Sequence, residues 1–239
     1  MFTGLVRSCG TLESLRSRPG GARLRIAAPA SLLARAEPGS SICVHGACLT
    51  SAAVDDRGFE ADLTEETLAR TRFATMGPGA VLHLEPSLRV GDPLDGHFVL
   101  GHVDGLGRLL ARAEGPWRFA APPDLAPLIA PKGSIALDGI SLTVVEVEGT
   151  GFSVALIPET IARTALKDLR PGAAVHLEAD PLARYAARAL QAGASEDRLH
   201  QHYRTALYPE SPAILGALTE AGALASFWSG AGPTLLGVC

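Results

Sequence analysis

The sequence predicts a mainly β protein that contains two duplicated domains, each folded as a small closed barrel. Residues 41–50 (SICVHGACLT) recur 93 positions later as residues 134–143 (SIALDGISLT), and the match continues without a gap to Glu85 and Glu178. A repeat this long that occurs only twice indicates two domains rather than a solenoid. Short β-prone segments separated by Gly and Pro turns are typical of closed barrels.

Local signals predict the elements of the first copy in order. Residues 23–28 (RLRIAA) alternate as a strand does. Pro29 begins a helix that ends before Pro38, and Thr64 caps the helical turn that follows it. Gly4, inside the first β-prone segment, marks a close approach of the backbone to a ligand or to another strand. The expected elements are strands at 2–6, 23–28, 41–45, 48–54, 59–63 and 80–85, with short helices at 29–36 and 64–71.

The second copy begins near residue 98, where Gly101-His102-Val103 takes the place of Gly4-Leu5-Val6. Residues 86–97 are rich in Pro, Gly and Asp, as a domain boundary is. The first copy carries four extra residues around 14–21. After the second copy the sequence predicts an amphipathic helix at 182–190, a helix at 211–225 and a strand at 234–238. The expected domains are 1–97 and 98–181 (barrels), 182–194 (helix and linker) and 195–239 (an extra α/β tail).

Composition excludes several classes of function. A hydrophobic content of 47% and a charged content of 19% describe a globular chain. A net charge of -4 gives no footprint for nucleic acid or for anionic lipid. The four cysteines have no C-x-x-C or zinc spacing, so we expect no metal and reduced thiols in a cytoplasmic protein. No secretory signal and no membrane span is expected.

Six motifs occur in order along the chain: MFTGLV, GACLT, ETLART, DGHFVLGHVDG, GISLT and ETIART. They resemble those of the riboflavin synthase family, the trimeric lumazine-binding type, and the resemblance extends from residue 1 to about residue 190. It implies two six-stranded Greek-key barrels and a helix that joins three subunits into a homotrimer. Each active site then forms between the first domain of one subunit and the second domain of a neighbour. The resemblance also leaves room for an association with lumazine synthase.

The reaction implied by the resemblance is a dismutation. One 6,7-dimethyl-8-ribityllumazine gives a four-carbon unit to another, which yields riboflavin and 5-amino-6-ribitylaminouracil, with no metal and no redox cofactor. A proton must leave an acidic ring methyl of one lumazine, and a nucleophile must add to the ring of the other. His102 with Ser141 or Thr143 could move protons near neutral pH, and Cys48 is the one thiol in either pocket motif.

The resemblance assigns site residues by position. Backbone groups and hydroxyls among them can pair with the pyrimidinedione edge and the ribityl chain. For the first lumazine the matching residues are Gly4, Leu5, Val6, Cys48, Leu49, Thr50, Asp62, Leu63, Thr64, Glu65, Glu66 and Thr67. For the second they are Gly101, His102, Val103, Lys132, Ser141, Leu142, Thr143, Ala155, Leu156, Ile157, Pro158, Glu159 and Thr160. Positions implicated in the chemistry are Ser41, Cys48, His102, Asp138, Ser141, Thr143 and Asp180.

Each residue alone has a simpler interpretation: Cys48 as a small buried side chain, His102 as a structural histidine, Lys132 as a surface charge. The two copies keep the ligand-holding residues but differ at the chemical ones, which favours an enzyme. A non-catalytic lumazine- or flavin-binding protein of the same fold is the alternative.

The tail resembles a different family. Residues 196–204 (EDRLHQHYR) and 227–239 (FWSGAGPTLLGVC) are similar to the C-terminal end of a homoserine kinase, of the GHMP kinase class. The glycine-rich run at 229–234 matches a motif that lies beside nucleotide phosphates in that class. The main phosphate-binding loop of the class and a Walker-type loop are both missing from the sequence. We therefore expect a fragment without kinase activity.

Overall fold

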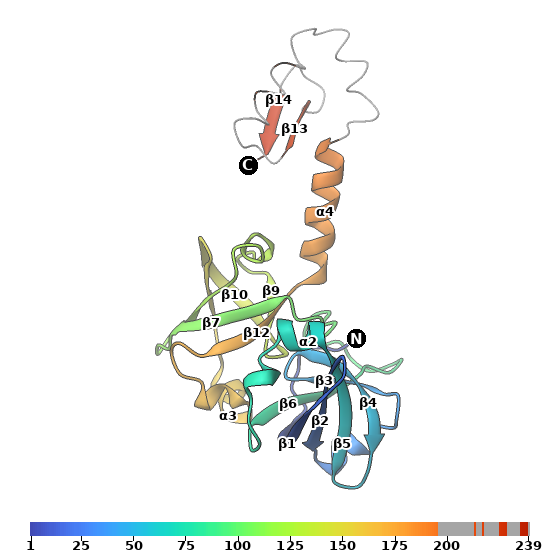
Figure 1. Ribbon diagram of the computed structural model, residues 1–239. Helices are drawn as coiled ribbons and strands as arrows, with labels where there is room; N and C mark the ends of the chain where they lie inside the picture. Colours follow the sequence, from blue (N-terminus) through green and yellow to red (C-terminus); the bar gives the residue numbers. More distant parts are fainter. Residues whose placement is uncertain (196–212, 214–216, 218–224, 229–234, 239) are drawn as a thin grey trace. The chain divides into compact units, whose positions relative to one another are not determined.

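A computed structural model describes residues 1–195, 213, 217, 225–228 and 235–238. Contacts divide the chain into two units, Met1–Pro181 and Leu182–Cys239. The first unit contains two closed, six-stranded antiparallel barrels, formed by β1–β6 and β7–β12 (Figure 1). The predicted pair of duplicated barrels is therefore confirmed.

The first barrel closes in the strand order β1-β2-β5-β4-β3-β6. Alternate side chains of its strands point inward and pack with Phe59 and Phe73 in one buried cluster. Thr64 caps α2 as expected, because its hydroxyl accepts a hydrogen bond from Thr67 N. The elements are β1 (Ser8–Arg18), β2 (Gly21–Ala27), α1 (Ala30–Leu33), β3 (Ser41–Val44), β4 (Ala47–Val54), β5 (Gly58–Thr64), α2 (Glu65–Arg70), the 3-10 turn η1 (Phe73–Thr75) and β6 (Val81–Pro86).

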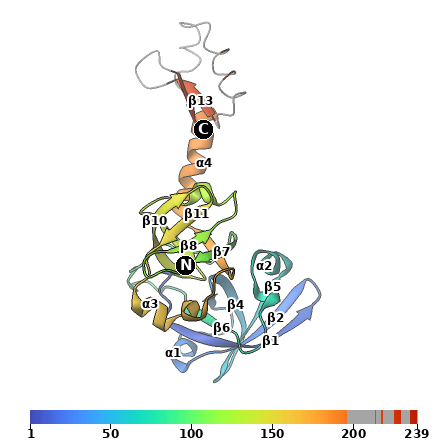
Figure 2. The same ribbon diagram turned by 90° about the vertical axis from the view of Figure 1, so that its left-hand side faces the viewer.

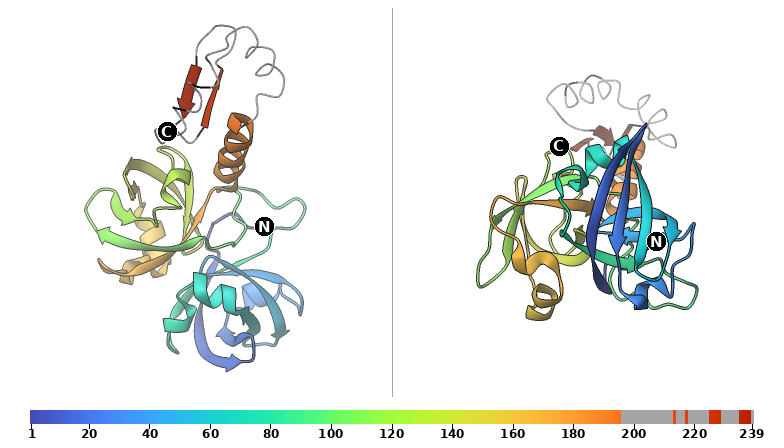
Figure 3. Two further views of the ribbon diagram at one scale, coloured as in Figure 1. Left: turned by 45° about the horizontal axis from the view of Figure 1, so that its top comes forward. Right: turned by 60° about the horizontal axis from the view of Figure 1, so that its bottom comes forward.

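The second barrel has the same topology, since its order β10-β11-β8-β7-β12-β9 is the equivalent ring. Its core is a separate buried cluster around Trp117, Phe119 and Phe152. Figure 2 shows α2 beside the first barrel and α3 beside the second, and Figure 3 shows the barrels in two further views. The elements are β7 (Gly105–Ala111), β8 (Trp117–Ala120), η2 (Ala126–Leu128), β9 (Ser134–Leu137), β10 (Ile140–Glu148), β11 (Gly151–Val154), α3 (Pro158–Arg163), η3 (Ala165–Asp168) and β12 (Ala174–Ala179).

Three features of the first copy differ from the sequence prediction, and one of them is α1, which spans only Ala30–Leu33 rather than 29–36. Residues 2–6 do not form a strand; Phe2 makes a single antiparallel bridge with Val99. The sequence analysis missed β1, which is 11 residues long. Its outer half pairs with β2 but not with β6 and is largely exposed on both faces, so it lacks the alternation that reveals a strand. The extra residues around 14–21 lengthen this hairpin.

The second unit is described in part. Helix α4 (Pro181–Ser195) confirms the helix predicted at 182–190 and is longer at both ends. Strands β13 (Ala225–Trp228) and β14 (Leu235–Val238) pair antiparallel; β14 confirms the predicted strand, and β13 was not predicted. Of the helix predicted at 211–225, Ala213 and Ala217 are helical, and 211, 212, 214–216 and 218–224 lie outside the described residues, as do 196–204 and 229–234. Among the residues that the structure describes, no helix is long and apolar enough to cross a membrane.

Candidate active site

The two repeated motifs each contain a tight turn in the middle, and these matching turns meet between the barrels. His45-Gly46 connects β3 to β4, and Asp138-Gly139 connects β9 to β10. All four residues have positive φ, of 50°, 93°, 48° and 82° respectively, as a two-residue type I′ hairpin requires. A Cβ added at Gly46 would lie 2.8 Å from Gly139 N, and one at Gly139 would lie 2.8 Å from Gly46 N. The glycines are therefore required by the contact between barrels as well as by the turns.

Histidines from both barrels connect across this contact. His83 Nε2 accepts a hydrogen bond from Ala165 N, at 2.8 Å, so the ring proton is on Nδ1. His83 Nδ1 then donates to the Asp138 carbonyl, also at 2.8 Å. The equivalent bonds of the other copy are His176 Nδ1 to His45 O, at 2.7 Å, and Arg72 N to His176 Nε2, at 2.8 Å. Both histidines are therefore held as neutral rings that fasten one barrel to the other.

Asp138 lies inside this contact, 2% exposed. Its Oδ1 accepts from His176 N at 2.7 Å, and its Oδ2 lies 3.2 Å from both Arg72 Nη2 and His45 Nε2. Arg72 also contacts His45 directly. Burial alone would raise the pKa of Asp138, but His45, Arg72 and His176 outweigh it and hold that pKa well below its ordinary range. The predicted catalytic Asp138 is thus a buried carboxylate at the barrel–barrel contact.

Stability should fall in mild acid because of the two buried histidines. Burial lowers the pKa of His83 to about 3 and that of His176 to about 4. The unfolded chain, with histidine pKa values near 6.5, binds more protons than the folded chain below that pH. The contribution of these two histidines to the free energy of unfolding should therefore be fully present above about pH 6.5 and be lost progressively as the pH falls to about 4 for His176 and about 3 for His83. Urea unfolding at a series of pH values checks this, and a flat profile across the window would contradict it.

The segments before the barrels cross over. Gly4 O accepts from Ser141 N, and Gly101 O accepts from Cys48 N, both at 2.8 Å. A Cβ at Gly4 would lie 2.6 Å from Ser141 Cβ, and one at Gly101 would lie 2.6 Å from Cys48 Cβ. The close approach predicted at Gly4 is confirmed. The sequence analysis grouped residues 4–6 with Cys48 and residues 101–103 with Ser141, and this grouping is corrected. The segment of residues 4–6 lies against the second barrel's motif, and the segment of residues 101–103 lies against the first.

Two buried carboxylates hold these crossing segments. Glu85 accepts hydrogen bonds from Thr3 N at 2.7 Å and Gly4 N at 3.1 Å. Glu178 accepts equivalent bonds from Leu100 N at 2.7 Å and Gly101 N at 2.9 Å. Burial raises the pKa of Glu85, against the effect of these donors. The sequence analysis missed this role, although the His-Leu-Glu that ends both copies was the available signal.

His97 was also missed as a site residue. Its Nδ1 lies 2.6 Å from Ser141 Oγ, while its Nε2 is buried and has no hydrogen-bond partner among the described residues. The side chain is 8% exposed. Burial lowers its pKa, and Asp180 opposes this. Because buried polar groups are usually paired, the unsatisfied ring nitrogen beside Ser141 marks His97 as a candidate for a functional role. The motif DGHFVLGHVDG contained the signal.

The remaining predicted residues divide by burial. Leu49 and Leu63 belong to the first core and Leu142 to the second, so their side chains serve packing, while Val103 packs on the first core and Val6 on the second. Asp62 is held by two bonds from Arg23, Nε at 2.6 Å and Nη2 at 2.5 Å. Exposed members are Thr50, Asp62, Thr64, Glu65, Glu66, His102, Lys132, Thr143, Ala155, Ile157, Pro158 and Glu159. Partly buried members are Leu5, Ser41, Cys48, Thr67, Ser141, Leu156, Thr160 and Asp180.

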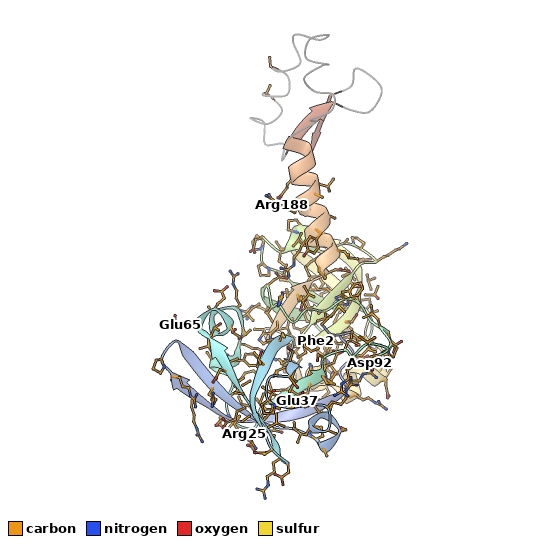
Figure 4. All side chains as sticks on the ribbon, turned by 90° about the vertical axis from the view of Figure 1, so that its right-hand side faces the viewer. Phe2, Arg25, Glu37, Glu65, Asp92 and Arg188 are labelled. Carbon is orange, nitrogen blue, oxygen red and sulfur yellow. The ribbon has the colours of Figure 1, made fainter. Side chains whose placement is uncertain are left out.

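The exposed residues come from matched segments of the two copies. We call Cys48, Thr50, His102 and the exposed residues of 62–67 the first rim, and Lys132, Ser141, Thr143 and the exposed residues of 155–160 the second rim. Figure 4 shows Glu65 on the outer side of α2 and Phe2 where the barrels meet. Cavities of about 370 Å³, beside Arg7 and Arg35, and about 280 Å³, beside Arg118 and Glu146, are lined by none of the predicted site residues.

Comparisons with known proteins agree with the two-barrel fold. A model of the lumazine binding domain matches residues 3–87 and again 100–180. Riboflavin synthase of Chlamydia muridarum (strain MoPn / Nigg) is 42% identical over 183 residues, which are 75% of this chain and 90% of that protein. Riboflavin synthase of Brucella abortus (strain 2308) is 39% identical over 203 residues, 80% of this chain and 98% of that protein.

A solved structure described as LumP complexed with riboflavin matches with a TM-score of 0.69 and 22% identity, over 75% of this chain and 99% of that one. At this identity the likeness supports the fold. A model of the C-terminal region of GHMP kinases matches residues 180–239, which confirms the second resemblance and includes α4. The Brucella match covers more residues than 1–180 contains, so both similarities reach α4. From the two lumazine binding domains and these relatives, the chain belongs to the riboflavin synthase family of enzymes.

Proposed function

We propose that the chain converts two molecules of 6,7-dimethyl-8-ribityllumazine to riboflavin and 5-amino-6-ribitylaminouracil at sites completed by a neighbouring copy. The carrying observation is that two equivalent rims present different chemical groups at matched positions. Cys48 contacts the Gly101 backbone on the first rim, and Ser141 contacts the Gly4 backbone on the second. Such a difference can assign the donor role to one substrate molecule and the acceptor role to an identical one.

Each rim then has its own role. On the first rim, Cys48 is the nucleophile that adds to one lumazine ring, and His102, next to Gly101, moves a proton. On the second rim, Ser141 and Thr143 face the other lumazine, and His97 positions Ser141. Asp62 to Thr67, and Ala155 to Thr160, hold the ring edges and ribityl chains, with Lys132 beside the second rim. Ser41 and Asp180 support the proton transfers.

The proposed assembly is a homotrimer in the cytoplasm. The open rims fit a site that a second barrel from a neighbour closes. Helix α4 carries exposed apolar side chains that suit a helix–helix contact between copies: Leu182 at 62%, Tyr185 at 74% and Leu190 at 70%. An association with lumazine synthase, which would supply the substrate, belongs to the same proposal. We place the barrels at 1–97 and 98–181, the joining helix at 182–194 and the kinase-like tail at 195–239.

One assay tests the function directly. The purified full-length chain is mixed with the lumazine alone, and substrate and both products are followed by chromatography. Two lumazines should disappear for each riboflavin, with one pyrimidine formed alongside. Saturable lumazine binding without either product would instead establish the non-catalytic binding protein.

The joining helix can be separated from the tail by a matched pair of shortened chains. A chain ending at residue 194 keeps nearly all of α4 and should retain the trimer, lumazine binding and turnover. A chain ending at residue 180 lacks α4 and should become a monomer with little turnover, because no neighbour completes its rims. Light scattering and turnover measure both. Loss of the trimer in the chain ending at 194 would make the tail an integral part of the enzyme.

A further inference from the structure

Two cysteines stand directly opposite each other in the first repeated motif. The register of β3 and β4 pairs Cys43 with Cys48, one residue beyond the Val44–Ala47 pair that closes the His45-Gly46 turn. A two-residue turn fixes this register, since neither strand can slip without breaking the turn. Directly opposed residues of an antiparallel pair place their side chains on the same face of the sheet.

The hydrogen bonds show which kind of pair this is. Cys48 N donates to Gly101 O, which lies outside the β3–β4 pair. On the other side of β3, His45 N donates to His83 O of β6. Backbone groups two residues apart on a strand point in the same direction, so those of Cys43 also face β6, where Cys43 is paired with Glu85. Cys43 and Cys48 are therefore a non-hydrogen-bonded pair, in which Cα atoms are about 4.5 Å apart. That separation lies within the range of about 4.4–6.8 Å found for disulfides.

The surroundings give the two thiols different access. Both lie outside the barrel core, where Cys43 is buried with Phe2, Val99 and Ala136, and Cys48 packs against this cluster. Cys43 is 3% exposed, whereas Cys48 is partly exposed on the rim. Burial raises the pKa of the Cys43 thiol.

The second copy serves as an internal comparison. Ala136 and Ser141 stand opposite each other at the matched positions, so packing on this face does not require sulfur. The thiol pair is a property of the first rim alone.

We propose that Cys43 and Cys48 are an oxidation site that forms an intramolecular disulfide when the protein meets a peroxide. The Cys48 sulfur attacks a peroxide oxygen and the O–O bond breaks. Cys48 becomes a sulfenic acid, and its thiol proton leaves with the released hydroxide as water. The Cys43 sulfur then attacks the Cys48 sulfur, the S–O bond breaks, and the Cys43 proton leaves with the hydroxide as a second water. Two thiols are oxidised and one peroxide is reduced. The disulfide removes the Cys48 thiol from the rim, so a thiol reductant should switch turnover back on; this consequence rests on the proposed function.

The test uses the full chain treated with hydrogen peroxide, followed by alkylation of the remaining thiols and peptide mapping by mass spectrometry. The expected product is a linked Cys43–Cys48 pair that has lost two hydrogens, with turnover lost in parallel and restored by dithiothreitol. Replacing Cys9 and Cys239 with serine should leave the linkage unchanged.

Cys43→Ala is the matched control, because alanine stands at the equivalent position 136. It should keep its turnover before oxidation, form no linkage, and lose activity to peroxide irreversibly as Cys48 passes to sulfinic acid. Should this variant fail to fold, the map of the unaltered chain decides alone. Two alkylated thiols, or a Cys48 sulfinic acid with free Cys43, in the peroxide-treated chain would overturn the proposal. A linkage in a protein that makes no riboflavin would refute the proposed function and leave the oxidation site standing.

Discussion

Replacing Asp138 with alanine should lower the free energy of unfolding by about 3–5 kcal/mol. The carboxylate is 2% exposed and faces Arg72 and His45, so its removal leaves positive charge at the barrel contact without a counter-ion. It also leaves His176 N without the acceptor it has at 2.7 Å. Small domains have only about 5–15 kcal/mol of stability, so the variant should unfold at much lower urea concentration.

Asp138→Asn is the matched control, since an amide oxygen still accepts from His176 N while the charge is gone. It should lose less stability than Asp138→Ala. Turnover of the folded asparagine variant then separates two roles. Near-normal turnover assigns Asp138 to the barrel contact, whereas a folded variant without turnover would restore it to the chemistry. If Asp138→Ala unfolded at the same urea concentration as the unaltered chain, the structural role would be contradicted.

His97→Ala should lower kcat by about 10²–10⁴-fold with little change in lumazine binding. Its Nδ1 lies 2.6 Å from Ser141 Oγ, so the ring fixes the direction of the serine hydroxyl and exchanges a proton with it. The buried Nε2 has no hydrogen-bond partner among the described residues, so among them Ser141 is the hydrogen-bond partner of this ring. Steady-state kinetics and a lumazine binding titration separate the two effects.

A double-variant cycle tests whether the two residues act together. If His97 works through Ser141, the His97→Ala/Ser141→Ala chain should be no slower than the slower single variant. His97→Gln, which keeps a polar group, should recover part of the rate. Full turnover in His97→Ala would show that the contact only holds residues 96–97 on the second barrel.

Local signals in the sequence were sufficient for most of the fold. The ungapped match between the copies established duplication, and the strands predicted at 41–45 and 48–54 correspond to β3 and β4. Thr64 capped α2, and the apolar face at 182–190 predicted α4. Each of these depends on residues a few positions apart, which interact in the same way wherever the element is packed. The strand β1 escaped prediction because its outer half is exposed on both faces.

The sequence by itself determined two equivalent barrels, their repeated motifs and the family. Only the tertiary structure decided which segments meet: Gly4 with Ser141, Gly101 with Cys48, His97 with Ser141, and Asp138 with Arg72 and His45. A repeat of 93 residues states which positions are equivalent, but it contains no information on which copy each one contacts. That choice is made by the packing of one barrel on the other, where the turns at Gly46 and Gly139 touch and each leading segment crosses to the opposite barrel. Contacts between residues so far apart in sequence follow from this packing and not from local propensity.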